Sequence, residues 1–221
     1  MTVSGVWDNT GEVAVKEGTL CLNDRSAENA MLGSGELSVE DGAVLCGLGK
    51  LGNASVTVKR GRRLYSGTRE GASSGTLDFS GKRLTVSTGG EVLFNVASKV
   101  RCTTLEGISS FSLRGTLKVS VREGLELEAG DEFQLWTANR TVLSSACTLD
   151  LDSPGEGLEW DTSALEDGVL KVKTATGIMG VVSGEPVDCV VYTLDGARAG
   201  SFTCMPSEVG EYMERNGFRS G

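Results

Sequence analysis

Histidine is absent from the chain of 221 residues, proline occurs only 3 times, and aromatic residues make up 5% of the sequence. Without histidine the chain cannot form a Ser-His-Asp triad, a Cys-His dyad or a histidine-ligated zinc site. No apolar run approaches the roughly 18 residues of a membrane-spanning helix, so we expect no membrane span. The first residues, MTVSGVWDNTGEV, do not show the basic and then apolar order of a signal peptide.

Positive charge is also scarce, because 21 Lys and Arg residues stand against 30 Asp and Glu, for a formal net charge of −9. A nucleic-acid-binding protein needs a net basic footprint, so we expect no nucleic-acid partner. Hydrophobic residues make up 39% and charged residues 23% of the sequence, which is not the composition of a disordered tail. The length is ample for a sizeable core.

Glycine, in contrast, is abundant and accounts for 31 of the 221 residues, about twice the usual ~7%. Apolar residues alternate with polar or small ones, as in Val13-Ala14-Val15 and Val56-Thr57-Val58. This period of two buries one face of a β-strand and leaves the other face in water. No convincing amphipathic helix precedes residue 200, so the sequence predicts an all-β chain.

A short unit, apolar-x-apolar-x-x-Gly, occurs five times and ends at Gly18, Gly42, Gly61, Gly89 and Gly124. It is typical of a strand, a tight turn that needs positive φ at glycine, and a second strand. The steps between these glycines are 24, 19, 28 and 35 residues, which suits the coils of a parallel β-solenoid with loop insertions. A β-sandwich of hairpins, which also has short strands and glycine turns, is the alternative.

We therefore predict a parallel β-helix with a C-terminal cap over residues 1–173 and a small separate β domain over residues 174–221. The short polar stretch 174–177 is the expected joint, and Val187, Cys189 and Val191 should share one strand of the second domain. The residues expected to point into the solenoid core are Val13, Val15, Leu37, Val39, Val56, Val58, Leu84, Val86, Phe94, Leu117 and Val119.

Several segments share a pattern that is specific enough to compare with a known family. GEVAVKEGTLCLN at 11–23 has a valine pair followed by Gly-Thr-Leu and a second apolar pair, and GTLDFSGKRLTVSTGGEVLF at 75–94 repeats the Gly-Thr-Leu strand. The most specific segments are GDEFQLWTANRTV at 130–142 and GLEWDTSALEDGVLKV at 157–172. Residues 11–173 thereby resemble the autotransporter-associated β-strand repeat regions of large bacterial surface proteins. This resemblance implies a right-handed β-helix.

The C-terminal residues show a different pattern. GIMGVVSGEPVDCVVYTLDGARAG at 177–200 contains Asp195-Gly196, which suits a tight hairpin turn. Together with PSEVGEYMERNGFRS at 206–220, it resembles the C-terminal sorting domain recognised by the type IX secretion system of Bacteroidetes. The terminal strand of such domains, expected after Gly221, is not in the sequence, so we expect this sorting-like domain to be incomplete. Neither family is catalytic in this part.

The cysteines show no Cys-x-x-Cys spacing, which argues against zinc and thioredoxin-like chemistry. Cys21 and Cys46 follow equivalent glycines, so we expect them to stack in adjacent coils. Our first interpretation is that the cysteines are small apolar core residues. A disulfide is the alternative in an exported protein, with Cys189 and Cys204 as the favoured local pair. The six are Cys21, Cys46, Cys102, Cys147, Cys189 and Cys204.

Acidic residues gather near the end of the expected solenoid, where closely spaced carboxylates could bind Ca²⁺ or act as a glycosidase acid–base pair. The segment lacks the Asp-x-Asp-x-Asp-Gly order of a calcium loop, and Trp160 and Thr162 belong to the structural signature of the repeat family. We interpret the cluster as a solvated acidic loop that caps the last coil. Its members are Asp150, Asp152, Glu156, Glu159, Asp161, Glu166 and Asp167.

Two further groups could contact a glycan. A basic run around Gly61 could hold a sulfated or phosphorylated glycan by charge, although most such runs are exposed turns. Scattered aromatic residues could stack on sugars, although aromatics in a solenoid more often cap an open end of the core. The basic residues are Lys59, Arg60, Arg62 and Arg63, and the aromatic residues are Trp7, Tyr65, Trp136 and Trp160.

These patterns lead to no catalytic, cofactor-binding or metal-binding residue, and no cofactor is expected. The predicted function is that of a non-catalytic C-terminal stalk and secretion-anchoring region of a larger exported bacterial surface protein. Its expected partners are the upstream domains of the same polypeptide and the sorting machinery, and its expected location is secreted or at the cell surface. The alternative is an accessory glycan-binding module of a polysaccharide-degrading enzyme, with polysaccharide as the partner. An enzyme, such as a β-helical lyase or hydrolase, is the least favoured hypothesis.

Overall fold

The computed structural model of the chain consists of two compact units, Met1–Thr174 and Ala175–Gly221. The division lies one residue beyond the boundary expected from the sequence. The residues that the structure describes are 2–3, 9–23, 34–40, 42–52, 55–67, 75–175, 187–192 and 198–205.

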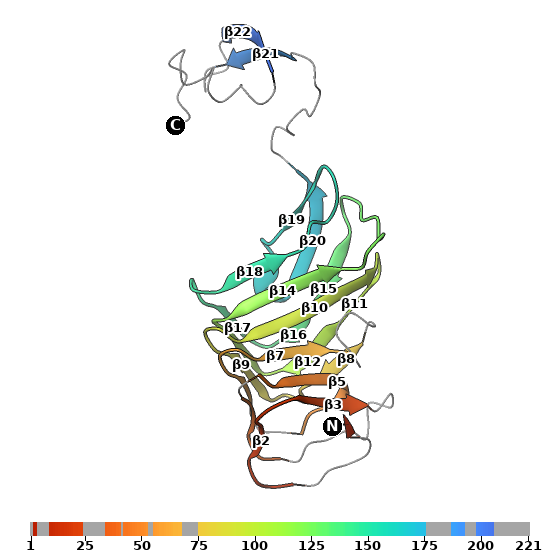
Figure 1. Cartoon of the computed structure of the whole chain (residues 1–221), viewed down its shortest axis with the longest axis vertical. Coiled ribbons are helices and arrows are strands. Elements are labelled where there is room, and N and C mark those ends of the chain that lie inside the picture. Colours follow the sequence, from red (N-terminus) through yellow and green to blue (C-terminus); the bar gives the residue numbers. More distant parts are fainter. Residues whose placement is uncertain are drawn as a thin grey trace. The chain divides into compact units, whose positions relative to one another are not determined.

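The first unit is a parallel β-solenoid of about 4 turns, with three sheets around one apolar core (Figure 1). The first sheet stacks β2 (Val13–Val15), β4 (Leu37–Val39), β6 (Ser55–Val58), β9 (Arg83–Val86), β13 (Ser110–Leu113) and β17 (Thr141–Leu143). The second sheet stacks β3 (Thr19–Asn23), β5 (Val44–Lys50), β7 (Arg63–Ser66), β10 (Glu91–Ser98), β14 (Thr116–Val121) and β18 (Thr148–Leu151). The third sheet stacks the end of β5 with β8 (Thr76–Asp78), β12 (Thr104–Ile108) and β16 (Trp136–Ala138).

Neighbouring strands within these three sheets run parallel. Two short strands join the second sheet: β1 (Thr2–Val3) pairs in parallel with β3, and β11 (Arg101–Cys102) pairs antiparallel with β10. The one helix among the described residues is the 3₁₀ turn η1 (Leu165–Asp167). The all-β solenoid prediction is therefore confirmed, and the hairpin sandwich is wrong.

The core is built by stacking equivalent apolar residues in register. Leu37 pairs with Val56, Val56 with Leu84, and Leu84 with Phe111, so one inward position is apolar in successive coils. All eleven residues predicted to point inward are buried, with exposed fractions of 8% or less. Burying each such side chain contributes roughly 1.5–3 kcal/mol, and every coil adds several of them.

Glycine turns connect the first sheet to the second in the early coils. The φ angle is +71° at Gly18, +69° at Gly42, +73° at Gly61 and +77° at Gly89. Such angles strain any residue with a Cβ atom, and Gly124 also has a positive φ of +75°, so the predicted positive φ is confirmed at the glycines of all five units.

The fifth predicted unit, which ends at Gly124, is out of line with the other four. Val119 lies on β14 of the second sheet, opposite Phe94, whereas the strand that continues the first sheet in this coil is β13. β13 and β14 are joined by only the two residues between 113 and 116. A Cβ atom on Gly115 would clash with the carbonyl oxygen of Gly90, so a close approach of two coils connects these two sheets here, while the positive-φ turn at Gly124 follows β14.

An antiparallel sheet closes the C-terminal end of the solenoid. It consists of β15 (Glu132–Gln134), β20 (Val169–Thr174) and β19 (Leu158–Asp161) in that order of pairing. Trp136 is fully buried beneath it, with its ring centroid 5.9 Å from that of Phe94 and 5.1 Å from that of Phe111. Phe133 and Trp160 pack edge to face at 6.1 Å. These aromatic pairs fill the C-terminal end of the core.

The second unit contains the antiparallel pair β21 (Val187–Tyr192) and β22 (Arg198–Cys204). The strand predicted to contain Val187, Cys189 and Val191 is confirmed. The predicted Asp195-Gly196 turn and the segment 206–220 lie outside the described residues.

The core ladder yields a matched pair of variants. Leu84→Ala removes a fully buried side chain of the first sheet, and we expect it to lower the free energy of unfolding by about 2–5 kcal/mol. Thr85→Ala, on the outer face of the same strand, should cost less than about 1 kcal/mol. Urea unfolding followed by circular dichroism measures both, and equal losses would contradict the inward and outward assignment.

Limited proteolysis tests the division into two units. The first cleavage should fall within 174–177, because this small, polar stretch lies at the boundary between the units. Mass spectrometry should then find an intact fragment that ends near Thr174. Equal resistance to cleavage across the boundary would argue for one continuous domain.

Candidate functional site

The outward side chains of the second sheet change from apolar to charged along the solenoid axis. Its central outward residues stack in register from coil to coil, and the N-terminal part of this ladder is apolar and buried. The C-terminal part is charged. In order along the axis the ladder consists of Cys21, Cys46, Tyr65, Leu93, Lys118 and Asp150.

The cysteines, all six of which are described, are thiols and form no disulfide. Cys21 lies opposite Cys46 on adjacent strands, as predicted from their equivalent glycines. Cys189 lies opposite Phe202 rather than Cys204, so the favoured local pair is offset along the hairpin. The interpretation as buried apolar residues holds for Cys21, Cys46 and Cys204, whereas the others are half-buried.

Burial makes the Cys46 thiol a poor nucleophile. Only 1% of Cys46 is exposed. Loss of solvent, together with a hydrogen bond that the Cys46 thiol donates to Cys21, raises the pKa of the Cys46 thiol to about 12. The thiolate is the reactive form of cysteine, so Cys46 is unsuited to covalent catalysis at neutral pH.

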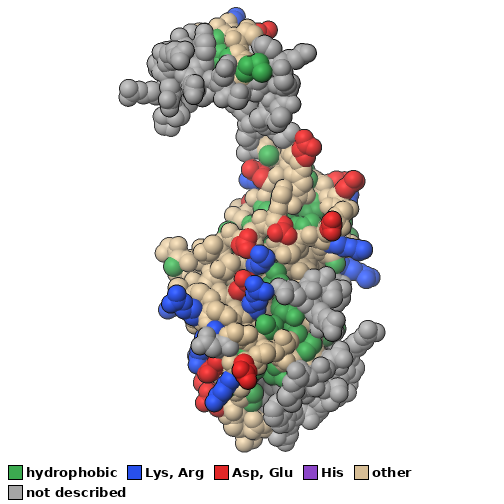
Figure 2. Space-filling view, in the orientation of Figure 1, with side chains coloured by type: hydrophobic (Ala, Val, Ile, Leu, Met, Phe, Trp, Pro, Cys, Tyr) green, Lys and Arg blue, Asp and Glu red, His purple; other side chains and the backbone are tan. Residues whose placement is uncertain are grey.

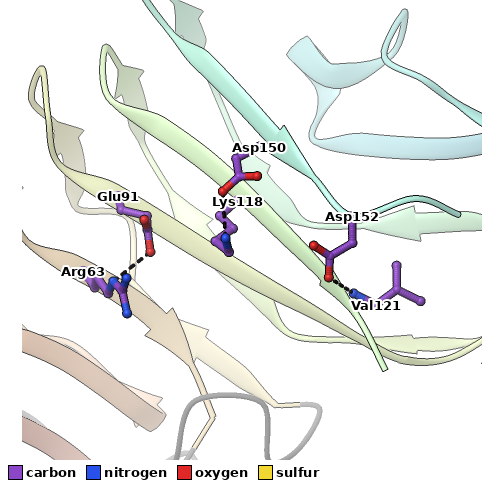
Figure 3. Close-up of polar contacts among 6 residues, drawn as sticks. All are labelled: Arg63, Glu91, Lys118, Val121, Asp150 and Asp152. Carbon is purple, nitrogen blue, oxygen red and sulfur yellow. Dashed lines mark hydrogen bonds and ion pairs between the residues drawn. The ribbon is translucent and has the colours of Figure 1, made fainter. Parts of the chain in front are cut away.

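Ion pairs join neighbouring coils at the charged end of this ladder and in the outward row beside it (Figure 3). Arg63 Nε lies 2.9 Å from Glu91 Oε1, which ties β7 to β10. Lys118 Nζ lies 2.7 Å from Asp150 Oδ2, which ties β14 to β18. The hydrogen bond to Asp150 raises the pKa of Lys118. A lysine with a raised pKa stays protonated, so Lys118 is not a general base.

The acidic residues predicted to form one solvated loop instead lie on separate elements. Asp150 is on β18, and Asp152 Oδ2 just beyond it accepts the backbone N–H of Val121 at 3.0 Å (Figure 3). Glu159 on β19 lies 3.4 Å from Lys173 Nζ. The loop interpretation is correct only for Asp152 and Glu156, which are exposed between β18 and β19, because strands form on each side of residues 152–157.

The remaining acidic residues do not converge either. Asp161 accepts the backbone N–H of Ser163 at 2.9 Å, and this hydrogen bond lowers the pKa of Asp161. A glycosidase acid needs a raised pKa, so Asp161 is unsuited to that role. Glu156, Glu166 and Asp167 are exposed. Within the described ranges, no three Cys, Asp or Glu side chains are grouped to hold a metal ion.

The basic run predicted from the sequence is dispersed by the turn that contains it. Lys59 Nζ lies 2.7 Å from Glu40 Oε1, and Arg63 pairs with Glu91. Arg62 is only 7% exposed. Of the four, Arg60 alone is exposed and has no carboxylate partner among the residues that the structure describes, so the run forms no continuous basic surface.

The aromatic candidates for sugar stacking are mostly inside the protein. Trp136 is fully buried, Tyr65 is 5% exposed, and Trp160 is half-buried with its indole N–H donated to the Asp152 carbonyl at 2.6 Å. Trp7 lies outside the described residues. Trp136 and Trp160 therefore fill the capped end of the core, as in the preferred interpretation.

An open groove of about 450 Å³ lies beside β11. Arg101, Cys102, Glu132 and Gln134 contribute to its walls. The Glu132 carboxylate is held by Lys171 at 2.8 Å, and the Cys102 thiol donates to the Gln134 carbonyl at 3.3 Å. The groove has one carboxylate among its lining residues, so it does not supply the acid and base that glycoside hydrolysis requires.

The outer face of the first sheet carries arginines that sequence reasoning missed. The strand register gives three outward rows: β9 and β13 each hold two of these positions and the third follows the strand, whereas β17 holds one and is flanked by the other two. On β9, β13 and β17 these nine positions hold three arginines, five hydroxyl side chains and one valine, and we term them the arginine–hydroxyl face. The residues are Arg83, Thr85, Ser87, Ser110, Ser112, Arg114, Arg140, Val142 and Ser144.

Comparison with known proteins adds no family. The chain matches no protein-family model and no curated protein sequence. Among the residues described here, no helix has the length and apolarity to cross a membrane. The two resemblances noted in the sequence therefore stay predictions.

The buried thiol has a pH signature. The pKa of a cysteine thiol is about 9 in the unfolded state, whereas that of Cys46 in the folded state is about 12. Between pH 9 and pH 12 the unfolded state therefore binds fewer protons than the folded state. The free energy of unfolding should then fall as the pH rises from about 9 towards 12, and it should fall less steeply in Cys46→Ala.

Alkylation tests the burial of Cys46 separately. Iodoacetamide at pH 8.5 should alkylate half-buried Cys189 well before Cys46, as measured by peptide mass spectrometry. Equal rates would contradict the burial of Cys46.

Proposed function

We propose that this chain is a non-catalytic C-terminal stalk and anchoring region of a larger exported bacterial surface protein. The observation that carries the proposal is the continuous apolar ladder of the solenoid, in which successive coils place buried residues in register from Val15 to Leu113, followed by half-buried Leu143. Such a ladder makes a self-supporting rod of stacked coils, since each coil contacts only its neighbours.

The charged side chains support a structural role. Three ion pairs, Arg63–Glu91, Lys118–Asp150 and Lys171–Glu132, link adjacent strands at 2.7–2.9 Å. Exposed pairs of this kind contribute little individually, about 0–1 kcal/mol. They do, however, pair these carboxylates with cations, whereas a hydrolase would need carboxylates in a cleft to act as its acid and base.

The anchoring part of the proposal rests on the sequence resemblance of residues 177–220 to type IX sorting domains and on their place in a separate unit. The partners would be the upstream domains of the same polypeptide and the sorting machinery of a Bacteroidetes cell. The location would be the cell surface or the medium.

An activity panel tests the absence of catalysis. The purified chain is incubated with neutral and acidic polysaccharides, and reducing ends and unsaturated products are measured. We expect no turnover. Turnover that disappears in Glu159→Gln or Asp161→Asn, but persists in the exposed-site control Glu166→Gln, would overturn the stalk proposal.

A surface-display assay tests the anchoring role separately. A reporter with an export signal is fused ahead of the full chain and expressed in a bacterium that has type IX secretion. We expect at least part of the reporter at the cell surface or in the medium, and complete retention in the periplasm when residues 175–221 are deleted. Periplasmic retention of both forms would contradict the anchoring role.

A further inference from the structure

The arginine–hydroxyl face is unusual in a chain with a net charge of −9. Arg83, Arg114 and Arg140 are all exposed, and none forms an ion pair with a described residue. Figure 2 shows Lys and Arg side chains projecting from the flank of the solenoid where Figure 1 labels β9 and β17. Several other cations of the sheet surfaces, such as Lys59 and Lys118, are paired with carboxylates.

The same outward positions hold acidic residues at the other end of the first sheet. The strands β2 and β4 carry Glu12, Glu36 and Glu40 at or beside their outward positions, and Glu40 is paired with Lys59. On β9, β13 and β17 every carboxylate is replaced by arginine, serine, threonine or valine. The short helix η1 contacts β17, but no ion pair joins its carboxylates to Arg140. Within the first sheet, the exposed arginines that have no ion-pair partner among the described residues therefore gather on β9, β13 and the start of β17.

The spacing of the arginines follows from the register of the strands. Arg83 and Arg140 occupy the same outward row, two strands apart, with Ser110 between them. Adjacent strands lie about 4.8 Å apart, so the two backbones are separated by about 10 Å. Arg114 occupies the row at the opposite end of the strands, and Thr85 and Ser112 lie between the rows. The result is a flat surface with cations at its margins and hydroxyls at its centre.

We propose that the arginine–hydroxyl face binds an extended polysaccharide that carries carboxylate groups. The guanidinium fork matches a carboxylate in a bidentate geometry, and serine and threonine hydroxyls both donate to and accept from sugar hydroxyls. A flat face of stacked strands accommodates a chain that lies along the solenoid rather than a small ligand in a pocket.

The density of negative charge along the polymer distinguishes this ligand from a nucleic acid. Duplex DNA carries one charge per ~1.7 Å of its axis and is bound through many phosphate contacts. Three arginines on a strongly acidic protein cannot neutralise such a chain, but they suit a glycan with one acidic group every one or two sugars. This inference goes beyond the proposed stalk function, which needs no ligand, so either proposal can fail alone.

Affinity electrophoresis of the full chain tests the proposal. Native gels contain polygalacturonate, dextran sulfate or neutral dextran, and migration relative to a gel without polymer gives the dissociation constant. We expect retardation by polygalacturonate that weakens as salt is added, and none by neutral dextran. Arg83→Gln/Arg140→Gln should weaken polygalacturonate binding by about tenfold or more, the effect of losing charge-assisted hydrogen bonds.

The matched control removes the same charge elsewhere. Arg101→Gln/Arg122→Gln changes two exposed arginines outside the first sheet, and it should bind polygalacturonate like the unmodified chain. Circular dichroism confirms that both double variants are folded. Absence of binding, an equal loss in both double variants, retardation by dextran sulfate alone, or equal binding of duplex DNA would each overturn the proposal.

Discussion

The structure depends on one constraint, which is that each coil must place its inward residues directly on those of the coil below. Leu37, Val56, Leu84 and Phe111 satisfy it at one position of the first sheet, and Leu20, Leu45, Leu64, Val92 and Leu117 at one position of the second. Because side chains alternate with a period of two, a slip of one residue would expose an entire inward row. The register that fixes the core therefore also fixes what every outer face displays.

The fold could be predicted because this constraint produces local patterns in the sequence. Alternation located the inward residues, and the glycines at 18, 42, 61 and 89 located the turns with positive φ. The unit at Gly124 was misplaced because Val119 and Val121 show the same local pattern while they lie on the second sheet. Local spacing alone does not tell which sheet a strand joins, since that depends on hydrogen bonds to the next coil.

The candidate sites were harder to predict, for a related reason. Lys59, Arg60, Arg62 and Arg63 are adjacent in sequence, but alternation and the turn at Gly61 send them to different surroundings. Conversely, Arg83, Arg114 and Arg140 are far apart in sequence and gather on one face through strand register. A usable signal existed for Arg83, which adjoins Leu84 of the predicted core, whereas Arg114 and Arg140 adjoin Leu113 and Thr141, which were not among the predicted inward residues. Stacking the sequence by coil, rather than scanning it for runs, would have found them.

The stalk proposal and the arginine–hydroxyl face share a single premise, namely that the coils form one continuous parallel ladder. Native-state hydrogen exchange tests this premise most directly, since the amides of each strand donate to the coil beside it. The account predicts comparably slow exchange for the amides of Leu84, Phe111, Val92 and Leu117, because they open together. Fast exchange in any of these strands, with protection confined to isolated hairpins, would contradict the continuous solenoid.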